Sequence, residues 1–124
     1  MHNNESAENY LETILMLSKK LRVVRSVDIA NELGYKKSSI SIAMKHLREK
    51  NHITVSPEGF IDLTESGLAI AEMIFERHEI LTKVLTDLGV SEEIASEDAC
   101  RIEHVISQES FDAIKAHILN FGTK

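Results

Sequence analysis

Residues 26–50 read SVDIANELGYKKSSISIAMKHLREK, and this stretch decides the fold. Residues 27–33 predict a short helix, and Gly34 follows them as the residue type that ends a helix in the left-handed conformation at least cost. Ser38 can then cap another helix that runs to about Lys50. The apolar positions of that helix are Ile40, Ile42, Ala43, Met44 and Leu47. Two helices joined by a short turn at a glycine, the second rich in serine and lysine, are typical of a helix-turn-helix.

The segments on either side extend this pattern. Residues 6–20 predict an amphipathic helix with Ser6 as its N-cap. Residues 52–63 predict a two-stranded hairpin, because apolar residues flank the turn signal Pro57-Glu58-Gly59 on both sides. A hairpin directly after the second helix corresponds to the wing of a winged helix. Each piece alone is common in proteins that bind no DNA, and it is their order that favours a DNA-binding function.

The charge distribution supports this interpretation although the net charge is −6. Residues 1–63 hold nine Lys/Arg and eight Asp/Glu, whereas residues 64–124 hold five and twelve. Within residues 36–50 there are five Lys/Arg against Glu49 alone, and a local basic stretch is what DNA phosphates meet. The residues that we expect to contact DNA are Ser26, Lys36, Lys37, Ser38, Ser39, Ser41 and Lys45.

The second half of the chain predicts helices only. A long helix capped by Thr64 or Ser66 runs through Leu85, and Leu88-Gly89-Val90 breaks it. Ser91 begins the next helix, which continues through 97–106, and 111–121 form another. The predicted fold is therefore mainly α with a small β-hairpin wing: a winged helix-turn-helix DNA-binding domain at 1–63 and a helical dimerisation domain at 64–124. Because so few helices make a thin domain, we expect a homodimer on an operator with two-fold related half-sites.

The composition excludes several classes of protein. No apolar run approaches the roughly 20 residues that a membrane span needs. The segment Met1–Glu5 has neither the basic nor the apolar part of a secretory signal. The single cysteine cannot form an internal disulfide. Together these features predict a cytoplasmic protein with no membrane partner.

A cluster of possible metal ligands lies in Cys100-Arg101-Ile102-Glu103-His104. On a helix Cys100, Glu103 and His104 share one face, and their mixed sulfur, oxygen and nitrogen donors suit Fe(II), Co(II) or Zn(II) better than Mg(II) or Ca(II). Further candidates are His78 on the long helix and Glu12, which shares a face of the first helix with Asn9. The spacing also allows a plainer interpretation, with Cys100 as a small packed residue and a Glu–His pair on a solvated face.

The chain resembles the diphtheria-toxin-repressor and manganese-transport-regulator family of metal-dependent transcriptional repressors. The matching stretches follow the family's order over nearly the whole chain: 8–14, 27–30, 38–41, 63–67, 77–81 and 99–104. The resemblance implies a winged-helix domain followed by a helical dimerisation domain, with metal held between them. It also implies that the SH3-like C-terminal domain of the longer members is lacking.

The ligand set that the resemblance implies is a hybrid. Cys100, Glu103 and His104 match the family's ligand helix in its iron-type version, which has a cysteine where manganese-type members have a carboxylate. Glu12 and His78 match manganese-type ligands, and Asn9 stands where the family has Asp or Met. The ancillary site of iron-type members is incomplete, with Thr82 and Ser96 at two of its positions. The expected cofactor is a divalent transition metal, with Fe(II) favoured and Mn(II), Co(II) or Zn(II) possible.

The function that follows is an iron- or manganese-responsive DNA-binding regulator, a repressor of metal-uptake genes. A cation bound by both halves would favour the DNA-competent arrangement. One alternative is a regulator of the same fold that senses no metal, either responding to oxidation of Cys100 or acting constitutively. Another is an enzyme with Cys100 and His104 as nucleophile and base. We expect no enzyme, because no oxyanion-type motif lies near these residues and the wing would be unexplained.

Overall fold

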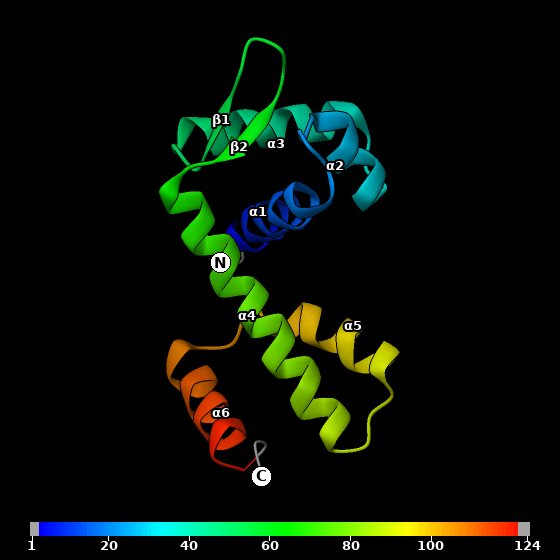
Figure 1. Cartoon of the computed structure of the whole chain (residues 1–124), viewed down its shortest axis with the longest axis vertical. Coiled ribbons are helices and arrows are strands. Elements are labelled where there is room, and N and C mark those ends of the chain that lie inside the picture. Colours follow the sequence, from blue (N-terminus) through cyan, green and yellow to red (C-terminus); the bar gives the residue numbers. More distant parts are fainter. Residues whose placement is uncertain (1–2, 122–124) are drawn as a thin grey trace. The chain divides into compact units, whose positions relative to one another are not determined.

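The computed structural model describes residues 3–121 (Figure 1). The described chain forms, in order, α1 (Asn3–Lys20), α2 (Ser26–Leu33), α3 (Lys37–Glu49), β1 (Ile53–Val55), β2 (Ile61–Leu63), α4 (Glu65–Asp87), α5 (Glu92–Ile102) and α6 (Gln108–Phe121). The predicted fold, mainly α with one hairpin, is confirmed. The helices and strands gather into two compact units, Asn3–Glu72 and Met73 onward, and α4 continues from one into the other. The predicted domain boundary at 63/64 stays a prediction.

The first unit is a three-helix arrangement closed by the hairpin. In it α1 contacts α2 and β2, α2 contacts α3, and α3 contacts β1. The strands are antiparallel, with Ile53 opposite Leu63 and Val55 opposite Ile61. The buried face of the unit is aliphatic and includes Leu11, Ile14, Ile29, Ile40, Leu47, Ile53 and Ile61. Burial of these side chains fixes which face of α3 is left for solvent.

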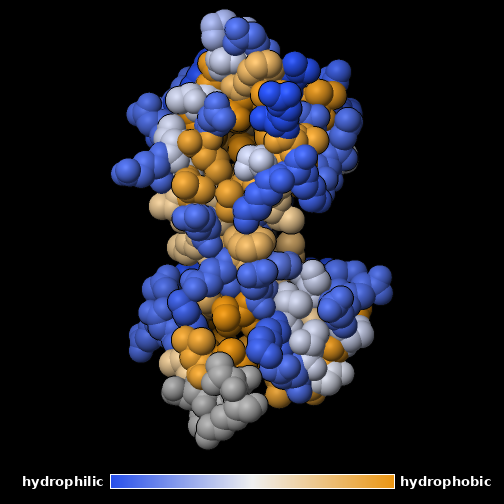
Figure 2. Space-filling model, viewed as in Figure 1, coloured by the Kyte–Doolittle hydropathy of each residue, from blue (hydrophilic) through white to orange (hydrophobic). Residues whose placement is uncertain are grey.

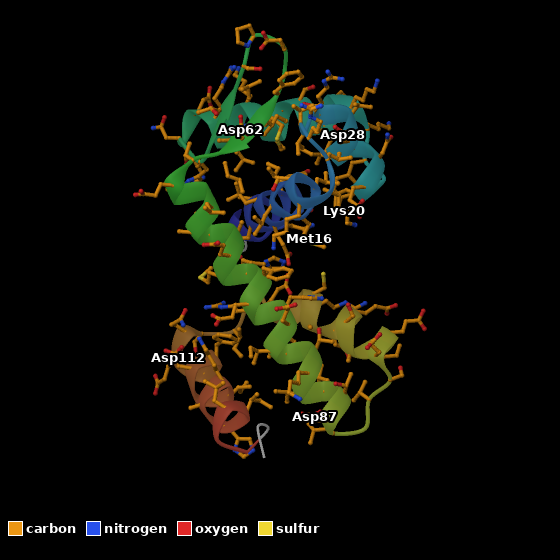
Figure 3. All side chains as sticks on the ribbon, viewed as in Figure 1. Met16, Lys20, Asp28, Asp62, Asp87 and Asp112 are labelled. Atoms are coloured by element: carbon orange, nitrogen blue, oxygen red, sulfur yellow. The ribbon has the colours of Figure 1, made fainter. Side chains whose placement is uncertain are left out.

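The helix ends agree in part with the sequence prediction. Gly34 has φ +71° and its N–H donates to the Ala30 carbonyl at 2.8 Å, as predicted for the end of α2. The prediction that Ser38 caps α3 is wrong, because the Lys36 carbonyl already accepts the Ile40 N–H at 3.1 Å and the helix begins at Lys37. The first helix also begins earlier than predicted, because α1 starts at Asn3 and not after Ser6. At the start of α2, Asp28 (labelled in Figure 3) accepts the backbone N–H of Arg25 at 2.9 Å.

The start of α4 is fastened to the segment that follows α3. Thr64 is the cap, since its hydroxyl accepts the Gly67 N–H at 3.2 Å, and the same hydroxyl donates to the Asn51 carbonyl at 2.7 Å. Ser66 also donates to that carbonyl, at 3.2 Å. A Cβ placed at Gly67 would collide with the carbonyl oxygen of His52 and lie 2.9 Å from its carbonyl carbon. The glycine therefore lets two backbone segments touch.

The second unit packs the rest of α4 with α5 and α6. Ser91 caps α5 as predicted, accepting the Ile94 N–H at 3.4 Å. The expectation that this helix continues to residue 106 is wrong, because α5 ends at Ile102 and the chain turns before α6. The cause is Arg77 of α4, whose guanidinium donates to the carbonyls of Glu103 and Ile106, both at 3.0 Å. The turn after α5 therefore lies where Arg77 binds these two carbonyls.

On the face that Figure 2 shows, polar residues surround apolar ones in each unit. In the second unit the exposed large apolar residues include Leu88, Ile94 and Val105. No helix in the described part of the chain has the length and apolar character needed to cross a membrane.

Candidate metal centre and DNA interface

Three of the predicted metal ligands come together within the second unit. His78 lies on α4, Cys100 on α5, and Glu103 directly follows α5. One ligand atom of each lies within 4.8 Å of those of the other two. The helical spacing that put Cys100 and Glu103 on one face is therefore realised, and α4 adds the imidazole. Cys100 is an exposed residue.

Glu103 is the centre of this cluster. Its side chain is 0% exposed, and its two carboxylate oxygens face two different imidazoles. Oε1 lies 2.9 Å from Nδ1 of His78, and Oε2 lies 3.4 Å from Nε2 of His104, whose side chain is only 3% exposed. Oε2 has no hydrogen-bond partner among the described residues. A carboxylate buried in this way is costly unless it is fully compensated, so the donor set fits a cation.

The second nitrogen of His78 is also engaged. Nε2 lies 3.3 Å from the Ser96 hydroxyl, so both ring nitrogens have partners. An outer hydrogen bond of this kind fixes the orientation of a metal-ligating imidazole. Ser96 and Thr82 occupy the positions at which the sequence resemblance left the ancillary site incomplete. The Thr82 hydroxyl is buried without a hydrogen-bond partner in the described chain, and an open hollow of about 360 Å³ lies beside it and His78.

Arg77 supports the cluster and was not identified from the sequence. It is buried, and besides its two carbonyl acceptors it donates to Oε1 of Gln108 at 3.0 Å. Its guanidinium lies 5.5 Å from the centre of the Phe111 ring. These contacts hold the turn that carries Glu103 and His104. A usable signal was present, because Arg77 occupies the same helical stripe as the apolar residues Ile74 and Leu81.

Two of the predicted ligands belong to the first unit. Asn9 and Glu12 lie on α1, where the backbone carbonyl of Asn9 accepts a hydrogen bond from the Thr13 hydroxyl at 2.8 Å and Glu12 is buried. Their predicted part in metal binding stays a prediction.

The residues expected to contact DNA lie at the surface of the first unit. On α3 the side chains of Lys37, Ser38, Ser39, Ser41 and Lys45 are exposed, and Lys36 precedes them. Ser26 is the first residue of α2. A hollow of about 170 Å³ is lined by Ser26, Ser41, Met44, Lys45, Arg48 and Val55. It joins residues from α2, α3 and β1, and it adds Arg48 to the expected set.

Comparisons with known proteins identify the family. A model of the N-terminal DNA-binding domain of iron-dependent repressors matches residues 3–59. A model of the metal-binding and dimerisation domain of iron-dependent repressors matches residues 64–124. The family resemblance inferred from the sequence is thereby confirmed.

Individual relatives agree with these matches. The transcriptional regulator MntR of Salmonella typhimurium is 36% identical over 122 residues, which cover 98% of this chain and 78% of that protein. An uncharacterised HTH-type transcriptional regulator of Methanocaldococcus jannaschii is 32% identical over 123 residues, covering 98% of each chain.

Solved structures show the same fold. A manganese-dependent transcriptional repressor in complex with manganese superposes with a TM-score of 0.82 at 25% identity, covering 90% of this chain and 52% of that one. The IdeR structure of T. acidophilum gives a TM-score of 0.78 at 27% identity, covering 93% and 53%.

These findings decide between the classes considered above. Its family consists of DNA-binding, dimerising regulators, so the protein is not an enzyme, and metal dependence is favoured over a regulator that senses no metal. The chain belongs to the iron-dependent repressor family of metal-dependent transcriptional regulators.

Proposed function

We propose that His78, Cys100, Glu103 and His104 bind the divalent transition metal to which this repressor responds. The observation that carries the proposal is the fully buried Glu103 carboxylate, whose Oε2 lacks a hydrogen-bond partner within the described chain. A bound divalent cation would compensate that charge and link the elements that supply its ligands. Arg77 holds the Glu103 turn, and Ser96 orients the His78 ring.

The choice of metal is part of the proposal. One solved relative is described as a complex with manganese, and Mn(II) prefers oxygen ligands. Cys100 adds a soft thiolate donor, which favours Fe(II), Co(II) or Zn(II). We therefore propose Fe(II) as the favoured metal, with a response to Mn(II) retained through the carboxylate and imidazoles.

The first unit would take part through α1. Glu12 keeps the ligand role that the family resemblance implies, and Asn9 offers a neutral carbonyl oxygen beside it. Ligands from α1 and from the second unit would together favour the DNA-competent state, which is what makes DNA binding depend on metal. High metal would then repress genes, and metal-uptake genes fit this sign of control.

On DNA, α3 would enter the major groove and the hollow at Ser26, Lys45 and Arg48 would receive a backbone phosphate. A dimer would place two α3 helices on two-fold related half-sites. Exposed apolar residues such as Leu88, Ile94 and Val105 supply area for contact with a second copy. A repressor must be in the same compartment as its operator. This agrees with the cytoplasmic location that the sequence predicts.

The test is DNA binding measured first in chelator and then with Fe(II), Mn(II), Co(II) and Zn(II) in turn. The DNA is a duplex selected by the metal-loaded protein from a random-sequence pool. We expect tight binding only with metal, and loss of the metal response in Glu103→Gln. The exposed Glu97 on α5 provides the matched control, and Glu97→Gln should behave as the unaltered protein. Equal binding in chelator and in metal would overturn the proposal and leave Cys100 as a redox or packing residue.

A further inference from the structure

The exposed face of α3 contains one residue that does not match its neighbours. Ile42 is 60% exposed, more than any other large apolar side chain of the first unit in the described chain. A single exposed apolar residue is ordinary on a protein surface. This one, however, lies in the middle of the helix that the proposed function puts against DNA.

Its position on the helix is defined by spacing. Ser38, Ile42 and Lys45 follow one another at i, i+4 and i+7, so they form one stripe along α3. The opposite face is buried through Ile40, Met44 and Leu47. Ile42 therefore points away from the core, between a hydroxyl and an ammonium group.

The charge along this stripe favours nucleic acid as the occupant. Between Lys37 and Arg48, α3 contains no carboxylate, and Glu49 is its only acidic residue. A negatively charged partner therefore meets hydroxyls and cations on both sides of Ile42.

The hollow beside Ile42 would fix how α3 lies on DNA. Ser41, Lys45 and Arg48 line it from α3, and Ser26 lines it from the start of α2. The two cations and two hydroxyls that line it, together with the N-terminus of α2 at Ser26, suit a phosphate. A phosphate held there by Lys45 and Arg48 leaves Ser38 and Ile42 facing the base edges.

The chemistry of isoleucine restricts what it can recognise. It has no donor or acceptor, so a hydrogen-bonding base edge placed against it would lose its water without compensation. The one apolar group on a base-pair edge in the major groove is the 5-methyl group of thymine. We infer that Ile42 selects thymine in each half-site by contact with this methyl group; the inference rests on the proposed entry of α3 into the major groove.

The experiment removes the methyl group from the DNA. In the selected duplex, thymidine is replaced by deoxyuridine at one position at a time, which deletes the methyl and keeps every hydrogen-bonding group. For the metal-loaded protein we expect one thymine per half-site at which this change weakens binding about fourfold, as for one buried methyl. Ile42→Ala should bind thymine and uracil at that position within about 1.5-fold, because the methyl has lost its partner.

Two further variants control the measurement. Ile42→Val keeps a branched apolar side chain and should keep most of the discrimination against uracil. Leu68→Ala removes an exposed apolar residue on α4 and should leave the discrimination unchanged. A flat uracil scan with the unaltered protein, or equal discrimination with Ile42→Ala, would overturn the inference while metal-dependent DNA binding stands. Absence of metal-dependent binding to any selected duplex would instead overturn the proposed function.

Discussion

Helix α3 of the first unit holds its polar groups at the surface, whereas the proposed metal centre of the second unit is built around a carboxylate that solvent does not reach. The serines and lysines of α3 are exposed and need no protein partner. Glu103 and Arg77 are buried, and each depends on groups from other elements. Substitutions at the DNA interface should therefore change DNA binding alone, whereas substitutions around the metal centre should also change folding stability.

The largest expected effect is on Arg77. Arg77→Ala removes the donor for two backbone carbonyls and Gln108, and unsatisfied buried groups are costly. We expect the free energy of unfolding of the metal-free protein to fall by about 3 kcal/mol, measured by urea denaturation. The control is Arg101→Ala, which removes an arginine whose side chain is 75% exposed, and it should cost below about 0.5 kcal/mol. If Arg77→Ala and Arg101→Ala lowered the free energy of unfolding equally, burial of Arg77 would not explain its contribution to stability.

A second test separates stability from metal binding at Glu103. Glu103→Gln removes the buried charge but keeps the shape, so the metal-free protein should unfold at the same temperature as the unaltered protein or at a higher one. Added Co(II) should stabilise the unaltered protein by about 2.7 kcal/mol at one hundred times its dissociation constant, and this gain should vanish in the variant. Thermal unfolding with and without Co(II) measures both. A variant that keeps the full gain would show that Glu103 does not ligate.

Substitutions on the exposed face of α3 should change DNA binding and leave folding unaffected. Lys45→Ala and Arg48→Ala should each weaken binding to all DNA sequences and lower the slope of log affinity against log salt by about one, with unfolding unchanged. Replacing Lys36 and Lys37 together should lower the slope similarly. Fluorescence anisotropy over a salt series gives the slopes. Lys83→Ala, an exposed lysine of the second unit, serves as the control and should leave the slope as it was.

The smallest expected effect concerns selectivity at Cys100. Cys100→Glu replaces a soft donor with an oxygen donor, so the response to Mn(II) should rise relative to Fe(II) and Co(II) by a fewfold. The readout is metal-dependent binding to the selected duplex, because Zn(II) affinity alone follows the Irving–Williams order in any variant. An unchanged ratio would show that the thiol does not set metal preference.

Sequence reasoning succeeded where the signal is local. Gly34 ends α2, Pro57–Gly59 form the hairpin turn, and Ser91 caps α5, each through contacts within a few residues. The helical spacing of Cys100 and Glu103 likewise needs only α5 and the residue that follows it. His78 was placed in the centre by resemblance to the family, and no spacing rule could bring it from α4.

Sequence reasoning failed where distant groups decide. The end of α5 at Ile102 depends on Arg77, which lies 26 residues before Glu103 in the chain. Helix α3 starts at Lys37 and not after Ser38. Ser38 is therefore not used as a cap, and Ser38 and Ser39 are both exposed. Arg48 was visible as a charge, but its place beside Ser26 and Val55 requires the packing of α3 against the strand.

Two glycines of the first unit should differ in the substitutions that they tolerate. Gly34 has positive φ and open space around it, so a D-alanine, for which that conformation is natural, should fit there in a chemically synthesised chain. At Gly67 the obstacle is the His52 backbone itself, so every L-residue collides whatever its rotamer. In a library selected for folding, position 67 should therefore stay invariant, whereas position 34 should admit asparagine, which tolerates the left-handed region.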